Sequence, residues 1–253
     1  MSAEWEIILQ RERSVVGAAI LGLALISWLE TIWKIGPMMG MPSLPLNAPA
    51  IAFFVVTWTI GMVAMMFPTT VPMLLMFLHV GKTASPEVRE GGGPSPAKAL
   101  AFVASYMMSW VLVGLVIYVA LAAILGLLPT ETETLIASPV GIGLALILVA
   151  LYQFSPVKGE CLRRCHPSSF LFKYYRGGVP GSLEMGLQYA RYCVGCCWVM
   201  MVFLLVAASM GVLWMAFFAG IIFVERSLTT SPWAPRIIGL GFFFSGILFV
   251  VVG

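Results

Sequence analysis

Residues 185–207 read MGLQYARYCVGCCWVMMVFLLVA, an apolar run that is long enough to form one membrane-spanning helix. It contains three thiols, those of Cys193, Cys196 and Cys197. Spacings of three and four residues place Cys193 on the same helical face as the other two. Soft sulfur ligands favour Cu(I), zinc or iron–sulfur centres over hard cations. One cysteine would be explained by packing, but three beside Gly195, which allows close helix approach, favour a metal site.

The composition assigns the chain to the membrane proteins. Of its 253 residues, 60% are hydrophobic and 10% are charged, whereas about 25% charged residues is usual in a soluble domain. Asp is absent, which argues against Asp-based catalysis and EF-hand calcium loops. We therefore expect an all-α, polytopic transmembrane bundle that sits in the lipid bilayer and has no nucleic-acid partner.

Hydropathy predicts about seven spans and a cytoplasmic N-terminus. Residues 1–14 are polar and form a cytoplasmic N-terminal segment without a cleavable signal peptide, and residues 15–253 form a single transmembrane domain. The predicted spans cover about Val15–Trp33, Pro49–Leu78, Ala99–Leu128, Ile136–Phe154, Met185–Ala207, a segment from a turn near Gly211 to Glu225, and Ile237–Val252.

The basic residues support this count and orientation. With the N-terminus inside, 12 of the 14 Lys and Arg residues lie on the cytoplasmic side, while Lys34 lies outside and Arg191 lies within the fifth span. If residues 185–225 were instead one span and a surface helix, the chain would end inside. Two cytoplasmic connections are predicted: a flexible, Gly- and Pro-rich linker over 81–98, and a longer cysteine-containing loop over 155–184.

A methionine face on the second span lies at a depth similar to the thiols. Met62, Met65 and Met66 share one side of a helix that Pro68 is expected to kink. At about 1.5 Å per residue, they lie roughly 16–22 Å from the outer end of their span, and the thiols lie roughly 12–18 Å from the inner end of theirs. These bands overlap in a core about 30 Å thick. Methionine stripes usually only pack, but the matching depth permits a mixed thiol–thioether site.

Two further thiols lie in the basic loop. Cys161 and Cys165 are four residues apart, and the neighbouring Lys158, Arg163 and Arg164 favour the thiolate form. The pair could form a second metal site, hand a metal to the membrane thiols, or belong to a basic surface turn with no metal. Its spacing differs from the Cys-x-x-Cys of zinc ribbons, so zinc is the weaker interpretation. Disulfides do not persist in the cytoplasm, so all five cysteines are expected to be free thiols or ligands.

Two charges are expected at membrane depth. Arg191 lies one or two turns into the fifth span, and Glu225 lies at the inner end of the sixth. Buried charges in a membrane are costly and generally paired. We therefore predict an ion pair between Arg191 and Glu225.

Taken together, these residues resemble a bacterial and archaeal family of predicted metal-binding integral membrane proteins. The resemblance covers about Ala50 to Arg226 and implies metal binding through cysteines and a multi-pass location in a prokaryotic plasma membrane. This chain has His166 where the family has Arg after the second loop cysteine. The matching residues are Trp58, Met62, Ala64, Met65, Met66, Pro68, Pro156, Lys158, Cys161, Cys165, Pro167, Cys193, Gly195, Cys196, Cys197, Trp198, Met200, Met201, Met210, Gly211, Trp214, Met215 and Glu225.

The leading hypothesis is a membrane protein that handles or delivers copper, binding Cu(I) through the thiols of the fifth span and the thioethers of Met62, Met65 or Met66. One alternative is a non-catalytic subunit of a larger membrane enzyme complex, such as a copper-dependent membrane monooxygenase. Another is thiol redox chemistry at Cys196 and Cys197 or at the loop pair. Hydrolase, phosphoryl-transfer and nucleotide-binding functions have no supporting motif, so an enzyme is not favoured.

Overall fold

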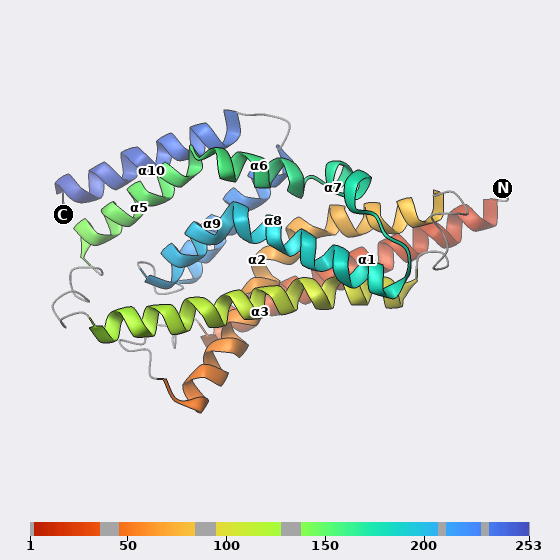
Figure 1. Cartoon of the computed structure of the whole chain (residues 1–253), viewed down its shortest axis with the longest axis horizontal. Coiled ribbons are helices and arrows are strands. Elements are labelled where there is room, and N and C mark those ends of the chain that lie inside the picture. The colour runs from red at the N-terminus through yellow and green to blue at the C-terminus, as the bar shows by residue number, and fades with distance from the viewer. Residues whose placement is uncertain are drawn as a thin grey trace.

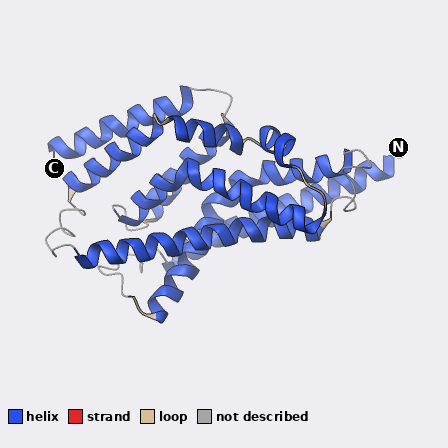
Figure 2. Ribbon diagram, viewed as in Figure 1, coloured by secondary structure: helices blue, strands red, loops and turns tan. Residues whose placement is uncertain are grey.

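The computed structural model describes residues 3–35, 46–83, 95–127, 138–206, 211–228 and 233–252, and within these ranges the protein is helical, with no strand (Figure 2). The predicted all-α class is confirmed. The helices are α1 (Ala3–Glu30), which continues into a π-helical turn η1 (Thr31–Ile35), α2 (Ala48–Thr83), α3 (Pro96–Leu127), α5 (Pro139–Gln153), α6 (Pro156–Cys165), α7 (Pro167–Tyr174), α8 (Gly178–Val206), α9 (Val212–Ser227) and α10 (Trp233–Val252).

Three pairs of helices make up most of the fold (Figure 1). Helix α1 packs along α2, α3 packs along α8, and α5 packs along α10. Helix α9 contacts members of all three pairs, namely α2, α8 and α10. The short helices α6 and α7 pack against α8 and α2, respectively. The buried side chains of these elements form one hydrophobic cluster, which contains both the methionine face of α2 and the thiols of α8.

Glycine allows α5 and α10 to approach closely. Gly143 of α5 faces Gly246 of α10, and a Cβ atom added to either one would lie 2.7 Å from the other residue's carbonyl oxygen. Small residues at such crossings let helices gain packing contacts that larger side chains would prevent. The two helices therefore lie side by side in Figure 1.

Helix α2 continues through both of its prolines, Pro68 and Pro72. Proline has no N–H, so Pro68 leaves the carbonyl oxygen of Ala64 without its usual helical donor. The indole Nε1 of Trp28 on α1 donates to that oxygen at 3.0 Å. The helix changes direction along its length in Figure 1, as expected for a proline-containing span. The proline thus creates the acceptor that fastens α1 to α2.

Most of the segment predicted as a loop over 155–184 is helical. Ser155 caps α6 by accepting a hydrogen bond from the Val157 N–H at 3.2 Å, and Pro156 occupies the first turn. Pro167 likewise occupies the first turn of α7. Proline ends one helix but suits the first turn of the next, which is why a segment interrupted by prolines still folds into short helices.

The other predicted boundaries are met in part. Residues 3–14 of the predicted N-terminal segment belong to α1. The linker over 81–98 is reduced at its ends by α2 and α3, and its middle, 84–94, lies outside the described residues, as do 207–210 at the predicted turn before α9.

Fewer helices than predicted are long and apolar enough to cross a membrane. Five described helices qualify by length and composition, and α5 with α6 would make a sixth, bent by 66°. Helix α9 has 16 residues, fewer than the roughly 20 that a span needs. The count of seven and the side of the N-terminus therefore stay predictions. The five qualifying segments are Ser14–Trp33, Ala48–His79, Pro96–Ile124, Gly178–Leu205 and Trp233–Val252.

The contact between α5 and α10 can be tested with two substitutions on one helix. Gly246→Ala places a methyl group against the backbone of α5 and should lower the free energy of unfolding by about 1–3 kcal/mol through overpacking. Gly241→Ala is the matched control, since nothing lies within 4 Å of an added Cβ there. Unfolding in detergent measures both. Equal stability of the two variants would contradict the close approach.

Candidate metal-binding site

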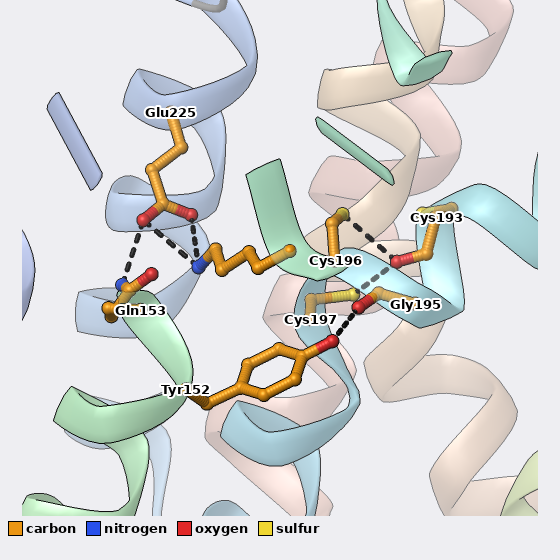
Figure 3. A network of polar contacts seen from close by, with 8 residues as sticks. Tyr152, Gln153, Cys193, Gly195, Cys196, Cys197 and Glu225 are labelled. Atoms are coloured by element: carbon orange, nitrogen blue, oxygen red, sulfur yellow. Dashed lines mark hydrogen bonds and ion pairs between the residues drawn. The ribbon is translucent and has the colours of Figure 1, made fainter. Parts of the chain in front are cut away.

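The three thiols of α8 lie in the protein core. Cys193, Cys196 and Cys197 are 0%, 3% and 1% exposed. The sulfhydryls of Cys196 and Cys197 both donate to the backbone carbonyl oxygen of Cys193, at 3.1 and 2.9 Å (Figure 3). Each thiol proton is thus held by the helix's own backbone, as short polar side chains often are in helices. To bind a metal through these sulfurs, the thiols must give up their protons and these hydrogen bonds.

A tyrosine from α3 contacts the first thiol. The hydroxyl oxygen of Tyr106 and the Sγ atom of Cys193 are 3.1 Å apart, and either can donate. Tyr106 is 1% exposed, and a buried phenol normally requires such a partner. The side chain reaches α8 because Gly186 has no Cβ, which would overlap Ser105 and the carbonyl of Phe102 on α3.

The first thiol of α6, that of Cys161, meets α8 at a glycine. The Sγ atom of Cys161 would lie 2.6 Å from a Cβ at Gly195, so it occupies the space that this glycine leaves. The hydroxyl of Tyr152, at the end of α5, donates to the carbonyl oxygen of Gly195 (Figure 3). Cys165, one turn after Cys161, is buried. All five cysteines are free, as predicted, and they belong to two helices that pack on one another.

The methionine face of α2 is buried in the core. Met62, Met65 and Met66 are 0%, 1% and 0% exposed. Helix α2 packs mainly on α1, α3 and α9, whereas α8 packs mainly on α3 and α6. A mixed site between α2 and α8 therefore stays a prediction. Among the described residues, no group of three His, Cys or acidic side chains is arranged to hold a metal.

The predicted ion pair between Arg191 and Glu225 is wrong. Glu225 instead pairs with Lys158 of α6, whose Nζ atom lies 2.8 Å from Oε2, and both side chains are almost fully buried, at 1% and 3% exposed. Arg191 is exposed on α8. Similar depth does not settle pairing, because the bend after α5 turns Lys158 inward while the rotation of α8 points Arg191 outward.

The other side chains expected to activate the loop thiols are also engaged. Arg163 and Arg164 both pair with Glu160, and Arg164 additionally donates to the hydroxyl of Tyr192 at 3.1 Å. The carboxylate of Glu225 accepts a further hydrogen bond, at 2.8 Å, from the Nε2 of Gln153 (Figure 3). Of the basic residues near Cys161, Lys158 thus joins α6 to α9, Arg164 joins α6 to α8, and Arg163 pairs within α6.

The fold and this arrangement define an all-helical protein with membrane-length helices and a buried cluster of free thiols. A family model described as "PpoB2: Copper chaperone" matches residues 55–249. The match covers more than half of the chain, so the protein belongs to this copper chaperone family. No significant match was found among curated proteins or solved structures.

Sequence reasoning missed three participants. Tyr106, Tyr152 and Arg226 each place a polar group among or beside the thiols. The two tyrosines carried a signal, because a phenol inside an apolar span has to find a hydrogen-bond partner. Arg226 carried none, since in the sequence it is one of several basic residues at the end of a helix.

The buried ion pair can be tested by a double-mutant cycle. Lys158→Met leaves the carboxylate of Glu225 buried without a cation and should lower the free energy of unfolding by about 3–5 kcal/mol. Adding Glu225→Leu removes both charges and should restore most of that loss. Unfolding in detergent is the measurement. The control is Arg176→Met, because its pair with Glu184 is 64% and 44% exposed and should contribute about 1 kcal/mol or less. Additive effects of the two core substitutions would contradict the pairing.

Proposed function

We propose that the protein is an integral membrane copper chaperone that carries Cu(I) as cargo on the thiols of α8 and α6. The observation that carries this proposal is the contact at Gly195, where Cys161 packs directly on the helix that bears Cys193, Cys196 and Cys197. Membership of the copper chaperone family indicates that the metal is copper. Thiolates are soft donors that suit Cu(I), so the two findings support the same function.

Adjacent thiols provide a route for moving the cargo. Cu(I) passes between sulfurs by ligand exchange, in which an incoming thiol loses its proton and an outgoing thiolate regains one, with no change in oxidation state. Cys161 packs on Gly195, the residue directly before Cys196 in α8. We propose that copper moves from the α6 thiols to the α8 thiols along this contact.

The methionines of α2 are proposed to add neutral ligands. A thioether binds Cu(I) without adding charge, whereas each further thiolate adds a negative charge that is costly in an apolar core. Met62, Met65 and Met66 are fully buried in the same hydrophobic cluster as the thiols. Thioethers on α2 would therefore raise affinity for Cu(I) at little electrostatic cost.

The membrane setting and the recipient belong to the same proposal. Five membrane-length helices support insertion in a bilayer, which we propose to be a prokaryotic plasma membrane with seven spans and the N-terminus in the cytoplasm. A chaperone needs a protein that accepts its cargo. We propose that the recipient is a membrane protein complex, since most of this chain would lie within the bilayer.

Copper binding should depend on both kinds of sulfur. Replacing Cys193, Cys196 and Cys197 together by Ser should abolish tight binding of Cu(I), because hydroxyl oxygen is a poor ligand for a soft ion. Replacing Met62, Met65 and Met66 together by Leu keeps the core volume and should weaken affinity about tenfold, equivalent to about 1.4 kcal/mol. Anaerobic competition with a coloured Cu(I) chelator, using full-length protein in detergent, measures both effects.

Met108→Leu is the matched control for the methionine variant, because Met108 lies 57% exposed on α3. It should bind copper like the wild type. If the wild type and the triple Ser variant bound equally little copper, the proposed function would fail. If the triple Leu variant bound copper like the wild type while the triple Ser variant did not, the thioethers alone would be excluded as ligands.

The recipient can be sought by cross-linking in native membranes. Copper-loaded protein should cross-link to a membrane complex, and that complex should then contain copper. The triple Ser variant should deliver no copper to it. Mass spectrometry and copper analysis of the cross-linked fraction provide the readout. Recovery of the monomer alone, in both loaded and unloaded membranes, would argue against a membrane recipient.

A further inference from the structure

Arg226, at the end of α9, places a guanidinium group beside the thiols. Its Nη1 donates to the Thr69 hydroxyl oxygen on α2 at 2.7 Å, and its Cζ lies 5.3 Å from the centre of the Tyr189 ring on α8. The thiol-bearing residue Cys165 lines the same pocket as Arg226. One side chain thus touches two helices of the core, α2 and α8, and lies beside a thiol of a third, α6.

This guanidinium has an unused donor. Its Nη2 atom is buried and has no hydrogen-bond partner in the described part of the chain. The adjacent carboxylate of Glu225 is already paired with Lys158, and no described carboxylate pairs with Arg226. A buried N–H without an acceptor is costly, and more so when it is charged. An anion that accepts this donor would remove the cost.

Arg226 is also one of the residues that line a pocket. Its volume is about 170 Å³, and it lies where α2, α6, α7, α8 and α9 meet. Its lining includes Pro72, Phe223 and Ser227, which are exposed at the protein surface. The polar groups in its lining are a thiol, an imidazole, a guanidinium, a phenol and two hydroxyls, those of Cys165, His166, Arg226, Tyr189, Thr69 and Ser227.

We infer that this pocket is where copper is received, as the anionic complex of Cu(I) with a small thiol that carries a carboxylate. Arg226 binds the anion, and Cys165 takes the metal from it. This inference rests on the proposed function and names the form of its cargo. Two thiolates give the copper centre one negative charge and each carrier adds a carboxylate, so the complex carries three negative charges in all. The single positive charge of Arg226 pairs with one of these carboxylates.

The exchange step balances in atoms and charge. The thiol of Cys165 forms a bond to copper, one bond from copper to a carrier thiolate breaks, and the proton of Cys165 leaves with the carrier as its thiol. Copper remains Cu(I), and the complex keeps one negative charge on the metal throughout. The positive charge of Arg226 therefore stabilises the anionic complex both before and after exchange. A donor that is already in place stabilises charge without the cost of rearranging.

Two copper sources of opposite charge test the inference on full-length protein in detergent. The anionic source is Cu(I) in excess mercaptoacetate, and the cationic source is the acetonitrile complex of Cu(I). Copper uptake is followed anaerobically by timed desalting and metal analysis. Arg226→Gln should slow uptake from mercaptoacetate about tenfold or more, as expected for the loss of a hydrogen bond to a charged group, and leave uptake from acetonitrile unchanged.

Three further variants sharpen the result. Arg226→Lys keeps the charge and should recover part of the rate from mercaptoacetate. Arg236→Gln makes the same replacement at an exposed position of α10, away from the pocket, and should behave as the wild type. Cys165→Ser should still bind the anionic complex, but it should take up copper from it slowly, because the sulfur that accepts the metal is gone.

Each outcome separates this inference from the proposed function. If Arg226→Gln took copper from both sources at wild-type rates, or slowed both equally, the inference would be overturned while copper binding stood. If the wild type took copper from neither source, the proposed function itself would fail. If Arg226→Gln did not fold, competition in the wild type decides. Methylthioacetate is an anion without a thiol. It should slow copper uptake from the mercaptoacetate complex but not from the acetonitrile complex. If uptake from the mercaptoacetate complex were not slowed, the inference would be overturned.

Discussion

Burying charge in an apolar core is tolerable only when the charge is paired, and the ion pair between Lys158 and Glu225 meets that requirement. Its two side chains come from α6 and α9, and Gln153 brings in the end of α5. The pair therefore constrains how the chain bends after α5. That bend places α6 against α8, which brings Cys161 onto Gly195. The meeting of the thiols thus depends on an electrostatic contact that contains no sulfur.

The same rule separates two neighbouring residues of α9. Glu225 has a full set of partners, whereas Arg226 keeps one buried donor without an acceptor. Structural ion pairs are satisfied within the protein, whereas an unpartnered donor on a side chain that lines a pocket is available to a ligand. The chemistry of a copper–thiolate complex supplies the missing negative charge. Glu225 therefore stabilises the fold, whereas the adjacent Arg226 is assigned to ligand binding.

Several features of the fold could be predicted from sequence because they depend on local patterns. Apolar length predicts α2, α3, α8 and α10 closely, since a helix in an apolar medium must satisfy its own backbone hydrogen bonds. The segment over 155–184 was harder. Its polar composition suggests a loop, but Ser155 and the prolines begin short helices whose apolar faces find a partner only in the folded protein. Depth along a span predicted the wrong partner for Glu225, because depth says nothing about rotation around the helix axis.

The sequence by itself determined an all-helical, membrane-length architecture and the presence of soft sulfur ligands, because hydrophobic run length and residue type are properties of the chain. The spacing of Cys193, Cys196 and Cys197 also placed these residues on one face of a single helix. Only the tertiary structure decided that Cys161 packs against Gly195, that Tyr106 contacts Cys193, and that Lys158 neutralises Glu225. These contacts join residues tens of positions apart, and their geometry follows from helix rotation and crossing, which no local pattern specifies.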